Sequence, residues 1–168
     1  MKLRHPVVRG HPLHAMASDL PVGILPLAFA ASVAARLRRS REATFTADAA
    51  AAAAALSFVP AALLGWWEWL TIPADHEARR PATIHGLVNT SATVLAMLAL
   101  WRPRRVELQI AALSSLVVGA WIGGDLVYRL GWRVRKAELY EQIQEGKSQD
   151  EAERAIQEHE RQDTFLAT

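Results

Sequence analysis

Long hydrophobic runs alternate with short clusters of charged residues along most of this chain. Four such runs, at about residues 12–37, 47–70, 82–101 and 108–130, contain few ionisable side chains. About twenty apolar residues in a helix span the ~30 Å hydrocarbon core of a bilayer. The pattern therefore predicts an all-α, multi-pass integral membrane protein built as a four-helix bundle.

The pattern changes after about residue 136, where hydrophobic residues become sparse. Residues 1–136 carry sixteen Lys and Arg against eight Asp and Glu, whereas residues 137–168 carry three against nine. In the second part, Gly146 is expected to end one short helix, and Ser148 with Glu151 forms a capping box for the next. We therefore predict a transmembrane domain over residues 1–136 and an acidic, helical, soluble tail over residues 137–168.

The distribution of charge and the amino-acid composition narrow the possible partners. The arginines lie between the hydrophobic runs, which is typical of bilayer-flanking residues, so a nucleic-acid partner is not expected. The absence of cysteine excludes disulfides, thiolate metal sites and covalent c-type haem attachment. Abundant Ala and Arg suggest a GC-rich bacterial gene. For a multi-pass helical protein from bacteria, we expect the inner (cytoplasmic) membrane.

The threading of four crossings predicts where the polar residues of the hydrophobic runs gather. An even number of crossings places both termini and the 71–81 loop on one side of the membrane. Eight polar residues lie at the helix ends on that side: His11, His14, Asp19, Glu68, His85, Asn89, Asp125 and Arg129. Asp48 lies at the opposite end, where we expect it to cap its helix. Because ionisable groups in a bilayer are costly, they usually face inward and pair, so a site in one leaflet is expected.

The residue types in this site allow several chemistries. For a haem b, we expect His14 and His85 as iron ligands, with Asn89 and Trp66 shaping the pocket. For a divalent metal ion, the candidate ligands are His11, His14, His85 and Asp125. A proton path through Asp19, Glu68 and Asp125 is a third alternative. The structural alternative is that Asp125 pairs with Arg129, while His85 and Asn89 form hydrogen bonds between helices.

Three segments resemble a known family. HPLHAMASDLPVG (residues 11–23), LTIPADHEARRPATIHGLVN (70–89) and IGGDLVYRLGWRV (122–134) are similar to bacterial membrane proteins of domain of unknown function 2231. The resemblance covers about residues 8–136 and implies a four-helix membrane domain. Relatives fused to Rieske or cytochrome c domains suggest membrane electron transfer by association. Many members carry a histidine where this chain has Leu130.

The sequence thus supports two functional hypotheses from different classes. In the first, the protein binds haem or a metal ion between its helices as a redox or ligand-binding module, with a redox partner. In the second, it is a cofactor-free accessory subunit that docks in a membrane complex or oligomer through its tail or its small-residue helix faces. Enzymatic activity is the least favoured hypothesis, because no spacing of a nucleophile and a base is recognisable.

Overall fold

The structure is a computed structural model that describes residues 6–8, 11–131, 142–143 and 145–163. Four long helices make up most of the chain: α1 (Leu13–Arg38), α2 (Arg41–Thr71), α3 (Arg79–Leu98) and α4 (Arg105–Tyr128). A 3-10 helix, η1 (Arg102–Arg104), precedes α4, and α6 (Gln149–Asp163) lies in the tail. Two short antiparallel strands, β1 (Val7–Val8) and β2 (His11–Pro12), precede α1.

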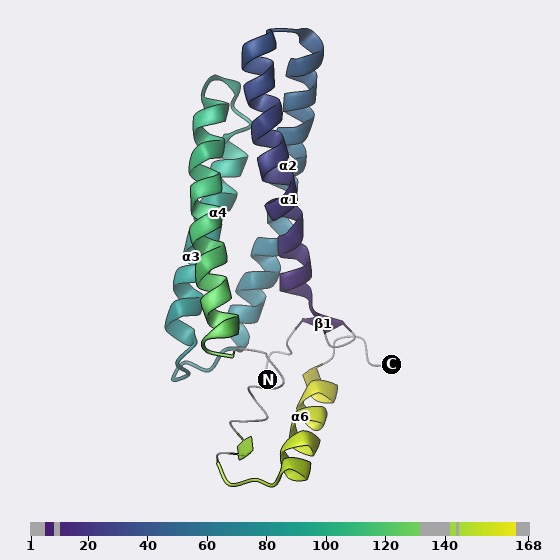
Figure 1. Cartoon of the computed structure of the whole chain (residues 1–168), viewed down its shortest axis with the longest axis vertical. Coiled ribbons are helices and arrows are strands. Elements are labelled where there is room, and N and C mark those ends of the chain that lie inside the picture. The colour runs from purple at the N-terminus through teal and green to yellow at the C-terminus, as the bar shows by residue number, and fades with distance from the viewer. Residues whose placement is uncertain (1–5, 9–10, 132–141, 144, 164–168) are drawn as a thin grey trace.

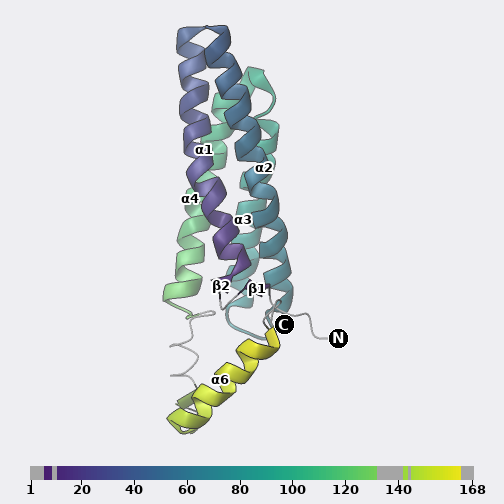
Figure 2. The same cartoon turned by 90° about the vertical axis from the view of Figure 1, so that its right-hand side faces the viewer.

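The four long helices lie side by side (Figure 1). Each packs against two others, because α1 contacts α2 and α4 while α3 contacts the same two helices. The pairs α1/α2 and α3/α4 therefore form two helical hairpins, with α1 and α3 placed diagonally. The connections 39–40 and 99–104 lie at one end, here called the arginine end (Figure 2). The chain enters α1, passes from α2 to α3 and leaves α4 at the other end, here called the histidine end.

Small residues allow the helices to approach closely in the middle of this assembly. The buried cluster there contains Ala28, Ala54, Ala92, Ala96 and Ala112, with Leu25, Phe58 and Leu116 filling the spaces between them. Small side chains at helix interfaces are typical of packing in membranes, where lipid offers no hydrophobic drive for association. The alanine-rich start of α2 thus serves as a contact face between helices.

Within the described part of the chain, three helical segments are long and apolar enough to cross a membrane: Leu13–Arg38, Arg41–Thr71 and Arg102–Tyr128. Their outward surfaces carry large apolar residues, including Leu27, Leu56, Leu63, Val117 and Trp121, each at least 68% exposed. Helix α3 does not meet this criterion, so the expectation that all four runs are apolar enough was wrong for α3. The reason is its polar content, since hydroxyl, amide and imidazole groups recur along its inner face.

One predicted helix start and one predicted cap were wrong at the arginine end. Helix α2 begins at Arg41, six residues before the predicted start, because Ser40 caps it by accepting a hydrogen bond from the Ala43 amide at 3.2 Å. Asp48 is therefore inside the helix and is no cap. Its carboxylate instead accepts from Arg102 and Arg105, with Asp48 Oδ1 lying 2.7 Å from Arg105 Nη1.

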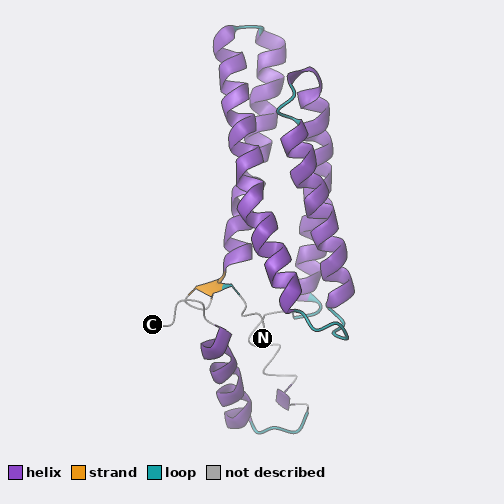
Figure 3. Cartoon of the chain, turned by 180° about the vertical axis from the view of Figure 1, so that it is seen from behind, coloured by secondary structure: helices purple, strands orange, loops and turns teal. Residues whose placement is uncertain are grey.

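The predicted capping box in the tail is confirmed. The backbone amide and the hydroxyl of Ser148 both donate to Glu151 Oε2, at 3.0 and 2.7 Å, directly before α6. Gly146 adopts a φ of +95°, the left-handed conformation expected after a helix end. Helix α6 lies beyond the histidine end of the long helices (Figure 3). Most of the first predicted tail helix lies outside the described residues.

Candidate functional site

A cavity of about 470 Å³ lies between the four long helices at the histidine end. Its wall is mostly apolar, with Phe58 and Leu116 toward the middle of the bundle and Ile72 and Leu126 toward the chain ends. Mostly apolar clefts and cavities of this size are typical of small-molecule and cofactor sites. The polar groups in its wall therefore decide what it can hold.

His14 and His85 meet in this cavity from diagonally placed helices. Their ring centroids are 6.1 Å apart, and the ring planes are nearly perpendicular, at 86°. His14 lies in the first turn of α1, while His85 lies two turns into α3. The structure thus brings together the two residues that the sequence analysis named as haem ligands.

Each imidazole is fixed by a backbone carbonyl of the next helix. His14 Nδ1 lies 3.0 Å from the Ala61 carbonyl oxygen, and His85 Nδ1 lies 2.9 Å from the Gly119 carbonyl oxygen. Because a carbonyl oxygen can only accept, Nδ1 carries the proton in both rings. In the neutral imidazole, Nε2 is then the nitrogen with the lone pair, which is the arrangement that orients histidine ligands at metals.

Glycines make this approach possible. A Cβ on Gly65 would lie 2.8 Å from Cε1 of His14, and a Cβ on Gly123 would lie 2.8 Å from Cε1 of His85. Each glycine is four residues after the residue whose carbonyl accepts the imidazole proton, so it occupies the same helix face one turn later. Gly119 and Gly123 of α4 therefore accommodate side chains of α3 within the same chain.

The two hairpins repeat this arrangement. Ser18, four residues after His14, donates its hydroxyl proton to the His14 carbonyl at 2.8 Å, and Asn89 Nδ2 donates to the His85 carbonyl at 2.9 Å. The Asn89 amide also lies 3.3 Å from both ring nitrogens of His85. Equal distances place it beside the ring and away from the lone-pair axis of Nε2. The two halves thus present equivalent histidines to one cavity.

Tryptophans of α2 close one side of the cavity. Trp66 Nε1 donates to Thr90 Oγ1 at 2.9 Å, and Trp69 Nε1 donates to Thr83 Oγ1 at 2.8 Å. The Arg79 guanidinium stacks 3.6 Å above the Trp69 ring and donates to the Trp69 carbonyl. The prediction that Trp66 shapes the pocket agrees with this geometry. Trp66 and Trp69 face inward and do not form a lipid-facing belt.

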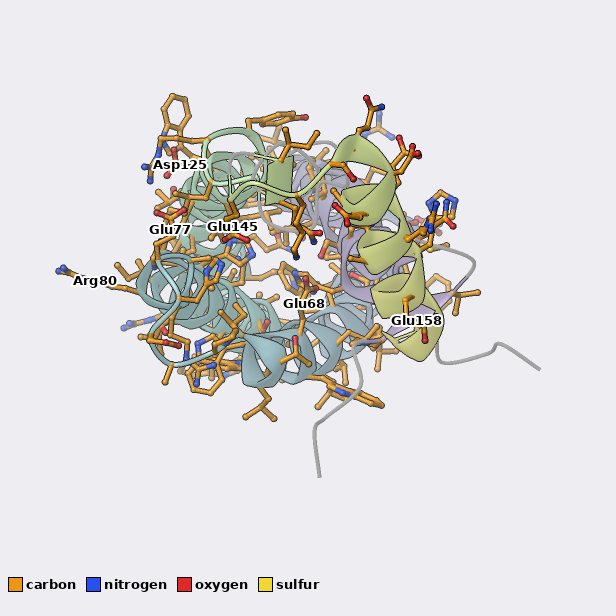
Figure 4. The ribbon with its side chains drawn as sticks, turned by 90° about the horizontal axis from the view of Figure 1, so that it is seen from below. Glu68, Glu77, Arg80, Asp125, Glu145 and Glu158 are labelled. Atoms are coloured by element: carbon orange, nitrogen blue, oxygen red, sulfur yellow. The ribbon has the colours of Figure 1, made fainter. Side chains whose placement is uncertain are left out.

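Several of the other predicted site residues lie away from the histidine cavity. His11 lies exposed in β2, Asp19 is exposed on α1, and neither lines the cavity. Asp125 forms a two-fold ion pair with Arg129, at 2.7 Å for both contacts, as the structural alternative predicted. Glu68 does line the cavity, and seen from the histidine end it lies between the helices, whereas Asp125 lies at the periphery (Figure 4).

The predicted four-residue metal-ion set is therefore not assembled. Among the described residues, no three His, Cys, Asp or Glu side chains are arranged to hold a metal ion. His11 lies away from the other candidate ligands because it pairs with Val8 in the strands before α1. The Asp125 carboxylate is not available to such a set because it forms an ion pair with Arg129, one turn further along the chain. The cavity thus offers two imidazoles and one carboxylate in an apolar wall.

Sequence reasoning missed the residues that position the histidines. The carbonyls of Ala61 and Gly119, together with Gly65 and Gly123, follow only from which helices are neighbours and how each is rotated. The spacing shared by Ala61–Gly65 and Gly119–Gly123 was the available signal, but small residues at four-residue spacing also occur at ordinary helix contacts.

Comparison with known proteins gives one family match. The family model described as "Predicted membrane protein (DUF2231)" matches residues 10–136, a stretch that includes all four long helices and every residue of the cavity wall. No curated protein and no solved structure matches the chain.

Proposed function

The chain belongs to the DUF2231 family of predicted membrane proteins, and we propose that it binds a b-type haem between His14 and His85 and carries electrons within the membrane. The observation that supports this most directly is the pair of imidazoles, each with Nδ1 held by a carbonyl and Nε2 left as the available ligand atom. The proposal includes α3 as a fourth membrane-spanning helix, whose polar side chains face the cavity.

The two histidines are placed so that both could hold one iron. An imidazole nitrogen binds a metal at about 2.0 Å, so two rings that share one iron would have centroids roughly 6 Å apart. The observed separation is 6.1 Å. Two imidazoles in direct edge-to-face contact without a metal also fall in this range, at about 4.5–7 Å. The carbonyl contacts favour the coordinated arrangement, because they direct the proton away from Nε2.

The cavity wall suits a large planar apolar group. Gly65 and Gly123 let the imidazoles lie close against the neighbouring helices, and Trp66 packs on Gly86, whose Cβ would lie 3.2 Å from the indole. A haem held by both histidines would supply one-electron transfer. The residues of this chain would hold the group, fix its ligands and exclude water.

Absorption spectroscopy of the purified protein tests the proposal. Protein produced with a haem precursor and purified in detergent is expected to show a Soret band and, after reduction, the sharp bands of a six-coordinate low-spin haem. His14→Ala and His85→Ala should each abolish the low-spin spectrum. His11→Ala is the matched control, because His11 is exposed three residues from His14 and should leave the spectrum unchanged. Colourless protein under these conditions would overturn the proposal.

A further inference from the structure

A second cavity, of about 340 Å³, lies at the arginine end, at the opposite end of the helices from His14 and His85. Its wall combines the end of α1, the beginning of α2 and the turn that opens α4. The polar residues of this wall are Ser32, Arg36, Thr44, Arg102, Arg105 and Glu107. We propose that this cavity binds the phosphate group of an anionic phospholipid.

One arginine forms the fixed floor of the cavity. Arg105 is only 8% exposed, and each of its guanidinium nitrogens has a partner: Nη1 pairs with Asp48 at 2.7 Å, Nε donates to the Ala99 carbonyl at 3.0 Å, and Nη2 approaches the Leu100 carbonyl at 3.5 Å. This arginine contributes positive potential, and its three partners hold the guanidinium in place.

Two further arginines flank the cavity with donors left over. Arg36 donates only Nη1, at 2.8 Å, to Glu107, and Arg102 uses Nε and Nη2 on Asp48. In the described part of the chain, Arg36 Nε and Nη2 and Arg102 Nη1 have no other hydrogen bond. Both side chains are 66% exposed, so their remaining N–H groups can turn toward an anion.

The charges around the cavity favour an anion over a cation. The wall contains three arginines but only one carboxylate, that of Glu107. A second carboxylate, that of Asp48, lies outside the wall and pairs with Arg102. Four more arginines lie at the same end outside the wall, at positions 38, 39, 41 and 104, against a single further acid, Glu42. The amino end of α4, which carries partial positive charge, also borders the cavity.

The position of the cavity identifies lipid as the source of the phosphate. It lies where the apolar segments Leu13–Arg38 and Arg41–Thr71 meet at their charged ends, which is the level of the headgroups for helices that cross the bilayer. Exposed Leu37 and Phe45 lie at the same end, with 77% and 75% of their surface available to acyl chains. Basic pockets between helices at this depth are suited to anionic headgroups.

Native mass spectrometry of the full-length protein tests this inference. Phosphatidylglycerol should remain bound at detergent concentrations that remove phosphatidylcholine, and the double variant Arg36→Gln/Arg102→Gln should bind it at least about tenfold more weakly. The matched control is Arg38→Gln together with Arg104→Gln. It removes the same charge from the same end outside the wall and should change the affinity less than about twofold.

Three results would overturn the assignment. Equal retention of both lipids shows no preference for an anion, and equal losses in the two double variants show a diffuse charge effect without a site. Inorganic phosphate binding as tightly as phosphatidylglycerol would show that lipid is not the ligand.

The double variant Arg36→Lys/Arg102→Lys is a control for folding. It keeps the charge and should retain most binding, which separates a lost site from a misfolded variant. The histidine cavity is untouched, so its Soret band is an independent check of folding if haem is bound.

Discussion

Gly65 and His14 lie so close that a single added methyl group on the glycine would meet the imidazole ring. A Cβ there would lie 2.8 Å from Cε1 and 3.0 Å from Nδ1, the atom that bonds to the Ala61 carbonyl. Gly123 stands in the same relationship to His85. The two glycines therefore determine where both imidazoles point, without themselves contributing any ligand atom.

Gly65→Ala and Gly123→Ala are expected to weaken haem binding, because each displaces a ring from its carbonyl partner. Loss of such an orienting contact typically costs about 10–100-fold in metal affinity. Titration of haem into the haem-free protein, followed by the Soret band, measures this effect. Gly23→Ala is the control: its Cβ meets no atom within 4 Å, and alanine favours the helix. Unchanged affinity in both cavity variants would remove the orienting role of the glycines.

Membrane threading gives a prediction that depends on α3. The natural chain has no cysteine, so single cysteines can be placed at exposed positions without background. Glu42→Cys and Arg104→Cys should react with a membrane-impermeant thiol reagent from one side of sealed vesicles. Asp75→Cys and Glu158→Cys should react only from the other side. If α3 lies on the membrane surface and does not cross, Asp75→Cys and Arg104→Cys will react from the same side.

Helix positions were largely predictable, because long apolar runs interrupted by arginine leave few alternatives in a membrane protein. The errors fell where a local cap competed with a charge. Ser40 and Asp48 both suit the start of a helix by residue type, and only the position of Arg102 and Arg105 across the bundle shows that Asp48 is used in ion pairs. Such a contact depends on helix rotation, which hydrophobic runs do not specify.

The candidate site was predictable only in part, for the same reason. An even number of crossings is enough to bring His14 and His85 to one end of the bundle, and the structure places them 6.1 Å apart. The number of crossings does not predict which polar residues at that end face inward. His11 and Asp125 are engaged in local structure, in β2 and in the pair with Arg129, and such near-neighbour contacts compete with a shared site.

The carboxylate of Asp48 is expected to stabilise the arginine end. Asp48→Asn leaves buried Arg105 without its charged partner and should lower Tm by about 3–8 °C, because unpaired buried charges are costly. Glu107→Gln is the matched control, since it breaks an ion pair whose two side chains are 66% and 56% exposed. Exposed pairs contribute little, so this change should lower Tm by less than about 2 °C. Equal shifts in the two variants would contradict the assigned difference.

The tail provides a test that depends on pH. The Ser148 hydroxyl and backbone amide hold the pKa of Glu151 below its usual value of 4.5 by donating to the carboxylate. Because the pKa is lowered in the folded state, this cap stabilises α6 fully above about pH 4.5. Its contribution is lost as the pH falls below that value and through the lowered pKa.

Carbon NMR of labelled glutamate in the full-length protein, recorded between pH 2.5 and 6, measures this coupling. Ser148→Ala removes the hydroxyl donor and should raise the pKa of Glu151 toward 4.5. Helix signals of residues 149–153 in the natural chain should weaken on acidification below pH 4.5, and in Ser148→Ala they should already be weaker at pH 6. Because this cap is remote from both cavities, haem spectra and lipid retention should not change in Ser148→Ala. A pKa of Glu151 that is the same with and without the Ser148 hydroxyl would show that the capping box does not form in solution.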